Sequence, residues 1–167
     1  MEPKHYEYKL KCGLKILLIP IKNSLISLQY TSKIGEDFER INTTDLEIVH
    51  TLEHLFSHMT SDKFPNGKEN ISNFNNLGIE HSAEVTETES KYNLFGHKKN
   101  YDLMFDMLTN TILNFKIDED IFNSEKKAII QELNDIINDT WFNLDLVLNQ
   151  NLFPNNLRSV SQKEKKK

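Results

Sequence analysis

The chain has 167 residues, of which 38% are hydrophobic, and this length and composition predict one globular domain with its own core. A net charge of -5 gives no basic surface that would gather phosphates, so nucleic acid is not an expected partner. Cys12 is the only cysteine, which excludes an intrachain disulfide and favours the cytoplasm or another reducing intracellular compartment.

The N-terminal segment has the pattern of a sheet. Residues 6–21 predict two short strands that are joined at a Cys12-Gly13 turn, and apolar residues alternate with polar ones in the strand expected at 25–32. The apolar run 14–21 is too short to span a bilayer and lacks the layout of a signal peptide. We therefore expect no membrane segment and no signal or transit peptide.

Helical periodicity begins after this region. Thr44 and Glu47 are spaced as a capping box, which predicts a helix that begins at about Asp45. A turn at 65–67 precedes a short helix that Gly78 can end. The pattern of the next residues predicts two further strands, at 79–87 and 90–96.

The remainder of the chain is helical in pattern, with helices expected at 98–114, 118–139 and 140–151. Strands that come mainly before helices predict an α+β fold, in which a mixed, mainly antiparallel sheet packs against helices. We expect one domain over residues 1–157, followed by a charged, solvated tail at 158–167.

The stretch HTLEHLFSH, residues 50–58, carries the strongest chemical signal. His50 and His54 are four residues apart, so they lie on one face of the expected helix. The apolar residues gather on a stripe that is nearly opposite, and these are Ile48, Leu52, Leu55 and Met59. Two imidazoles placed in this way can bind one metal ion.

Glu53 lies on the flank of the same helix face, where its carboxylate can reach a water on that metal without replacing a ligand. A catalytic zinc site has three protein ligands and one open position. His54 and His58 form an alternative pair, but no carboxylate stands between them in the base position. The other histidines, His5, His81 and His97, are scattered and are expected to be ordinary polar residues.

A third ligand is expected on a different helix. Glu125 and Glu132 are seven residues apart, which is two helical turns, and both lie at the edge of an apolar stripe. Half-buried carboxylates require a cation or a metal as partner. The alternative is that these glutamates pair with nearby lysines such as Lys126 or Lys127.

The segment HTLEH resembles the inverted zinc-peptidase motif H-x-x-E-H, which is shared by the family of pitrilysin, insulin-degrading enzyme and the mitochondrial processing peptidase. KLKCGLKILLIP and LGIEHSAEVTETESKYNLFG are also similar to segments of that family. The resemblance implies that His50, His54 and Glu132 bind Zn²⁺, with Glu53 as the general base. It further implies that Glu125 does not bind the ion itself but contacts the residues that do.

The same resemblance implies that the strand around Ser82 and Ala83 binds an extended peptide by backbone pairing. Family members usually carry Asn where this chain has Ser82, and Gly where it has Glu47. A family domain is also longer than this chain, so the expected domain is incomplete at its C-terminal side. A second peptidase-like domain or chain is expected to complete the substrate chamber.

The sequence therefore predicts a zinc-dependent metalloendopeptidase that hydrolyses extended peptides or unfolded polypeptides. The alternative from another class is a non-catalytic, zinc-binding or structural subunit of a larger peptidase-like assembly. A third reading, a helical interaction module with incidental histidines, would leave the spacing of Glu132 as a coincidence.

Overall fold

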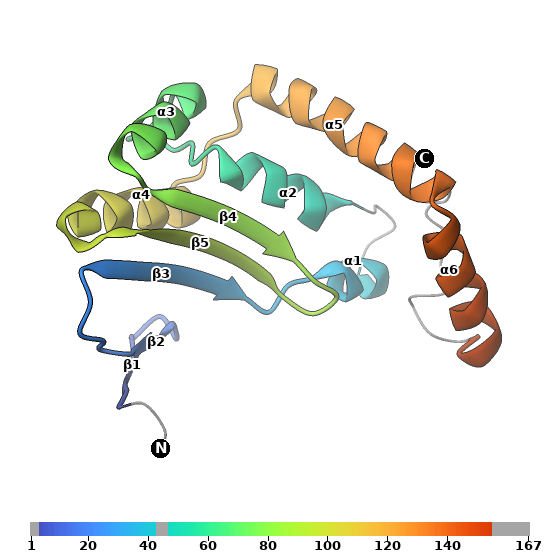
Figure 1. Cartoon of the computed structure of the whole chain (residues 1–167), viewed down its shortest axis with the longest axis horizontal. Helices are drawn as coiled ribbons and strands as arrows, with labels where there is room; N and C mark the ends of the chain where they lie inside the picture. Colours follow the sequence, from blue (N-terminus) through green and yellow to red (C-terminus); the bar gives the residue numbers. More distant parts are fainter. Residues whose placement is uncertain (1–3, 43–46, 155–167) are drawn as a thin grey trace.

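The computed structural model describes residues 4–42 and 47–154, and these form two antiparallel sheets with helices packed on one of them (Figure 1). A hairpin of β1 (Tyr6–Lys9) and β2 (Lys15–Leu18) comes first. The main sheet has the strand order β3-β5-β4, with β3 at Leu25–Ser32, β4 at Glu80–Val85 and β5 at Ser90–His97. The predicted α+β class is confirmed.

The helices follow the predicted order with one addition. They are α1 (Glu36–Asn42), α2 (Ile48–Ser57), α3 (Gly67–Leu77), α4 (Tyr101–Leu113), α5 (Glu119–Asn138) and α6 (Thr140–Leu152), with a 3-10 turn at Lys98–Asn100. The added helix is α1, which was not predicted from the sequence. Gly78 ends α3 as expected, in the left-handed conformation that glycine adopts without strain (φ 65°). The predicted boundary at residue 157 lies outside the described residues.

One face of the main sheet forms the core. Ile26, Leu28 and Tyr30 alternate along β3 and face the interior, and Leu28 and Tyr30 are opposite Leu94 and Tyr92 of β5. The buried centre consists of Met59, Phe74, Ile79, Tyr92, Leu94, Met104, Met107 and Leu108. Helices cover this face, because α4 contacts β3 and β5 while α2 contacts β4 and β5.

The position of β4 exposes one strand edge. Within the described chain β4 pairs only with β5, so its other edge carries no strand. α2 packs on β4, and α5 crosses over α2 on the side away from the sheet (Figure 1). This arrangement stacks α5, α2 and β4 and positions the candidate site.

The start of α2 differs from the prediction. Glu47 has a left-handed backbone (φ 71°, ψ 13°), its side chain makes no capping hydrogen bond, and the helix begins at Ile48. The proposed capping partner Thr44 and the predicted start at Asp45 lie outside the described residues. Glu39 of α1 caps the helix instead, because its carboxylate accepts hydrogen bonds from the backbone N–H groups of Glu47 and Val49. The predicted capping box is therefore wrong for Glu47, whose side chain does not cap the helix.

Glu39→Ala is expected to destabilise the fold. Glu39 is only 4% exposed, and its loss leaves two amide groups at the start of α2 without their acceptor. We expect a cost of about 2 kcal/mol, which lowers the thermal unfolding midpoint by about 4 to 8 °C. Circular dichroism melts measure this, with Glu39→Gln, which retains one acceptor oxygen, as the matched control. A midpoint for Glu39→Ala equal to that of wild type would show that Glu39 does not hold α2.

Large apolar side chains remain exposed on α6, which extends beyond the end of the sheet (Figure 1). They are Trp141, Leu144, Val147, Leu148 and Leu152. None of the helices in 4–42 and 47–154 combines the length and apolarity that crossing a bilayer requires. A cluster of exposed apolar residues of this kind is typical of a surface that contacts another polypeptide.

Candidate metal centre

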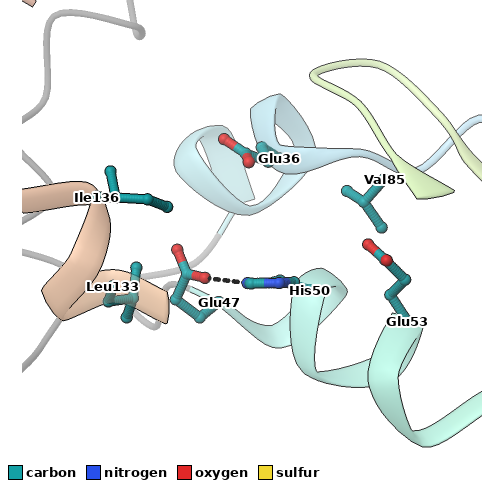
Figure 2. A pocket seen from close by; sticks show the side chains of 7 residues that line it. All are labelled: Glu36, Glu47, His50, Glu53, Val85, Leu133 and Ile136. Atoms are coloured by element: carbon teal, nitrogen blue, oxygen red, sulfur yellow. Dashed lines mark hydrogen bonds and ion pairs between the residues drawn. The ribbon is translucent and has the colours of Figure 1, made fainter. Parts of the chain in front are cut away.

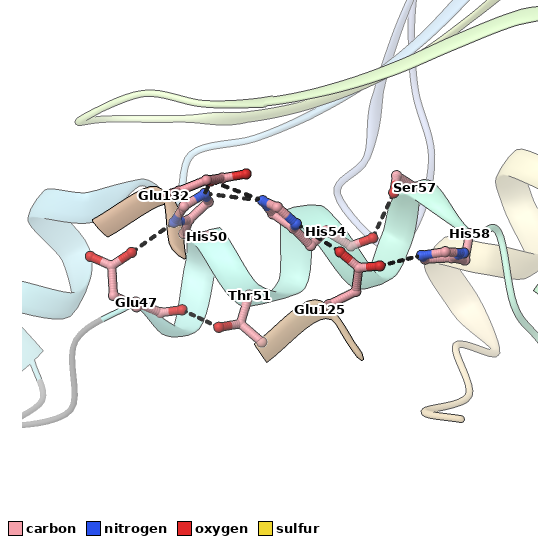
Figure 3. Close-up of polar contacts among 8 residues, drawn as sticks. All are labelled: Glu47, His50, Thr51, His54, Ser57, His58, Glu125 and Glu132. Atoms are coloured by element: carbon pink, nitrogen blue, oxygen red, sulfur yellow. Dashed lines mark hydrogen bonds and ion pairs between the residues drawn. The ribbon is translucent and has the colours of Figure 1, made fainter. Parts of the chain in front are cut away.

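Two packed helices supply the candidate site (Figure 3). His50 and His54 project from α2 toward α5, since residues four apart share a helix face. Glu125 and Glu132 project back from α5, where a separation of seven residues also places them on one face. The structure thus brings together all four residues that the sequence proposed as ligands or their supports.

Three of these side chains meet at one point. His50 Nε2 lies 3.2 Å from His54 Nε2 and 3.3 Å from Glu132 Oε2, and the third side of this triangle, His54 Nε2 to Glu132 Oε2, is 3.6 Å. A tetrahedral zinc ion with ligand bonds of about 2.0 to 2.1 Å places its ligand atoms about 3.3 to 3.4 Å apart. Among the described residues no other group of three His, Cys, Asp or Glu side chains has geometry suited to a metal. The donor set therefore fits zinc.

The other nitrogen of each imidazole faces a carboxylate. His50 Nδ1 lies 2.7 Å from Glu47 Oε2, and His54 Nδ1 lies 2.9 Å from Glu125 Oε2. When Nδ1 carries the proton and donates a hydrogen bond to the carboxylate, the Nε2 lone pair of each ring points at the triangle. Two lone pairs and the Glu132 oxygen then converge, and such a group of acceptors requires a cation.

Glu125 joins two histidines. Its second oxygen, Oε1, lies 3.0 Å from His58 Nε2, so His58 contacts this carboxylate and lies outside the triangle. Of the alternative pair, only His54 therefore belongs to the three-residue group, and His58 does not. Burial raises the pKa of Glu125, but hydrogen bonds from His54 and His58 lower it further, so the net pKa lies below its ordinary value.

Glu53 lies beside the triangle, between two hollows. One hollow, of about 140 Å³, is lined by Glu36, Glu47, His50, Glu53, Val85, Leu133 and Ile136 (Figure 2). Burial raises the pKa of the Glu53 carboxyl above its ordinary value, although the charges of His50 and His54 oppose this shift. A carboxylate with a raised pKa is better matched to accepting a proton near neutral pH.

The profile of the insulinase family, peptidase family M16, matches residues 44–161, which include the whole of this site. The chain belongs to this family. The resemblance seen in the sequence is thus confirmed. Comparison with curated protein sequences gives no match.

Solved structures share the fold of this insulinase-family chain. A protease from Helicobacter pylori is 24% identical with a TM-score of 0.69, over 78% of this chain and 31% of that one. Pitrilysin is 19% identical with a TM-score of 0.77, over 95% of this chain and 17% of that one. The periplasmic protease PqqL from Escherichia coli is 16% identical with a TM-score of 0.80, over 99% of this chain and 20% of that one. The chain therefore spans about a third or less of each of these proteins.

The two residues proposed for substrate contact lie on opposite faces of β4. Ala83 lines the second hollow together with Glu53, His54 and Ser57. Ser82 is exposed, and its hydroxyl accepts a hydrogen bond of 3.3 Å from the Asn93 side chain. The structure thus brings Ala83 to the candidate site and turns the Ser82 side chain away from it.

Sequence reasoning missed Glu47 as a member of the site, because it assigned that carboxylate to a capping box. The spacing contained the signal, since a carboxylate three residues before a histidine can reach it on a helix. Among the remaining histidines, His81 is half-buried with its ring centroid 5.7 Å from that of Phe74, and burial lowers its pKa. His5 and His97 are exposed, as expected of ordinary polar residues.

Proposed function

We propose that this insulinase-family chain is the zinc-binding part of a metalloendopeptidase, with His50, His54 and Glu132 as the ligands. The triangle of 3.2, 3.3 and 3.6 Å between the three ligand atoms carries this proposal, because its sides fit the edges of a tetrahedral zinc site. The family membership supports a peptidase role.

Glu53 is the general base in this proposal. It takes a proton from the water that attacks the peptide carbonyl and returns the proton to the leaving amine. A bound zinc ion supplies Lewis acidity, which polarises the carbonyl and makes water acidic enough to react near neutral pH. The raised pKa of Glu53 supports its role, and the residue lies beside Val85 of β4 in the lining of the first hollow.

The free edge of β4 is the proposed substrate platform. An extended peptide can add to an exposed strand edge through backbone hydrogen bonds, which read no particular side chain. Ala83 lies beside Glu53 and His54 in the second hollow, so a peptide on this edge would pass close to the metal. Peptides and unfolded polypeptides fit this mode, because a folded protein rarely offers a free extended strand.

A non-catalytic, zinc-binding or structural subunit is the second candidate. The observation that favours it is the group of exposed apolar residues on α6, which indicates contact with further polypeptide. In either case the partner is a second peptidase-like domain or chain. The reducing compartment that the single Cys12 favours stays a prediction.

The isolated chain is expected to bind zinc but to cleave peptides poorly. Both helices of the proposed zinc site are present, whereas stabilisation of the developing oxyanion needs further donors, each worth about 10² to 10³ in rate. Metal analysis and cleavage of a fluorogenic unstructured peptide, with and without a partner domain added in trans, measure both properties. Robust cleavage by the monomeric chain, abolished in Glu53→Gln, would contradict this expectation. Absence of stoichiometric zinc would contradict the proposed function itself.

A further inference from the structure

Glu47 occupies a backbone conformation that disfavours it. Its φ of 71° lies in the left-handed region, which glycine adopts freely and residues with a Cβ adopt at a cost. Only Glu47 and Met59 among the described non-glycine residues have a positive φ. The surrounding structure fixes Glu47, because its N–H donates to Glu39 and its carbonyl accepts from the Thr51 amide at 2.8 Å. Such strain is retained where the neighbouring structure determines the position.

The side chain of Glu47 is directed at a candidate metal ligand. Its Oε2 lies 2.7 Å from His50 Nδ1, and the side chain is 11% exposed (Figure 3). Burying a carboxylate costs free energy unless a partner compensates it, and the imidazole N–H is such a partner. Neither the backbone conformation nor the burial favours glutamate here, and the contact with His50 Nδ1 compensates the burial of the carboxylate.

We propose that Glu47 is a positioning residue for the zinc ligand His50, which it orients by accepting a hydrogen bond from Nδ1–H so that Nε2 faces the metal position. This inference rests on the proposed zinc site. The two ligand histidines are then supported in the same way, His54 by Glu125 of α5 and His50 by Glu47 of the segment before α2. A carboxylate that accepts a hydrogen bond from the second ring nitrogen of a metal-binding histidine fixes the orientation of the ring and strengthens it as a ligand.

A purely structural role is the alternative for Glu47, and the contacts argue against it. A carboxylate at the start of a helix can stabilise that helix by capping its free N–H groups. The Glu47 side chain makes no such bond, and Glu39 accepts from the N–H groups of both Glu47 and Val49. Since Glu39 accepts from the backbone N–H of Glu47, the cap survives replacement of the Glu47 side chain.

Glu47→Gly separates the two roles. Glycine relieves the left-handed strain, so the metal-free protein should unfold at the same temperature or about 2 to 4 °C higher. The same change removes the His50 partner, so zinc affinity, measured by competition with a chromophoric chelator, should fall by about 10- to 100-fold. Glu47→Gln keeps an oxygen that can accept a hydrogen bond from Nδ1–H, so its zinc affinity should lie between those of Glu47→Gly and wild type. Its unfolding midpoint should not rise, because the strain remains.

Glu80→Gln serves as the control for the loss of one negative charge, since Glu80 is exposed at the start of β4. It should bind zinc like wild type. Wild-type zinc affinity in Glu47→Gly would overturn the inference. A loss of zinc affinity together with a lower unfolding midpoint of the metal-free protein would also overturn it, because that combination indicates a structural role. If wild type itself binds no zinc, the proposed function fails, and that result is distinct from either outcome.

Discussion

His54→Ala is expected to abolish stoichiometric zinc binding. His54 Nε2 lies 3.2 Å from His50 Nε2 and 3.6 Å from Glu132 Oε2, so its removal leaves two ligands where a zinc site requires at least three from the protein. The remaining pair cannot hold the ion against a chelator of moderate strength. Elemental analysis after dialysis against such a chelator measures the loss, and His50→Ala and Glu132→Gln should give the same result.

His58→Gln is the matched control for this result. His58 is one further turn along the same helix face but contacts Glu125 instead of the triangle, so zinc should remain at one ion per chain. A weaker affinity is compatible with its contact to Glu125. Loss of zinc in His58→Gln together with retention in His50→Ala would show that His54 and His58 form the pair.

Glu53→Gln is expected to give the largest effect on catalysis. The change preserves the shape of the side chain but removes its capacity to accept a proton, so zinc should be retained while turnover falls by about 10²- to 10⁴-fold. The measurement requires the active form of the protein, with any partner domain present. Metal content and peptide cleavage are compared on the same preparation.

Glu84→Gln, on the exposed face of β4, controls for the change of a glutamate near the proposed substrate edge. It should leave both zinc content and turnover near wild type. Turnover in Glu53→Gln that equals wild type would remove Glu53 from the mechanism, whereas loss of zinc in Glu53→Gln would assign it a role in binding the metal.

The parts of the fold that follow from local periodicity could be predicted from the sequence. Alternation along residues 25–32 anticipated β3, and Gly78 anticipated the end of α3. The start of α2 could not be predicted, because Glu39, eight residues before Glu47, supplies the cap. The predicted apolar stripe was also imperfect, since Ile48 is 41% exposed and its neighbour Val49 is buried. The first difference arises from a contact with α1, which the local pattern does not encode.

The candidate site, too, could be predicted only in part from the sequence. The spacing of His50 and His54 placed two ligands on one face, but only the packing of α5 on α2 brings Glu132 to them. From the residues alone, pairing of Glu125 with lysine was an open alternative, and the structure instead places its two oxygens at His54 and His58. The resemblance to the family implied that Glu125 and Glu132 lie beside the histidines, although they are far from them in the sequence. Members of the family usually carry glycine at the position of Glu47, which agrees with the left-handed backbone there.

X-ray absorption at the zinc edge of the metal-loaded wild-type chain tests the central claim most directly. We expect one zinc per chain, coordinated by two imidazole nitrogens and one carboxylate oxygen at about 2.0 to 2.2 Å, with the remaining position filled from solvent. A shell with three imidazoles would bring His58 into the site, and a sulfur at about 2.3 Å would bring in Cys12. Either result would contradict the assignment of His50, His54 and Glu132 as the metal centre.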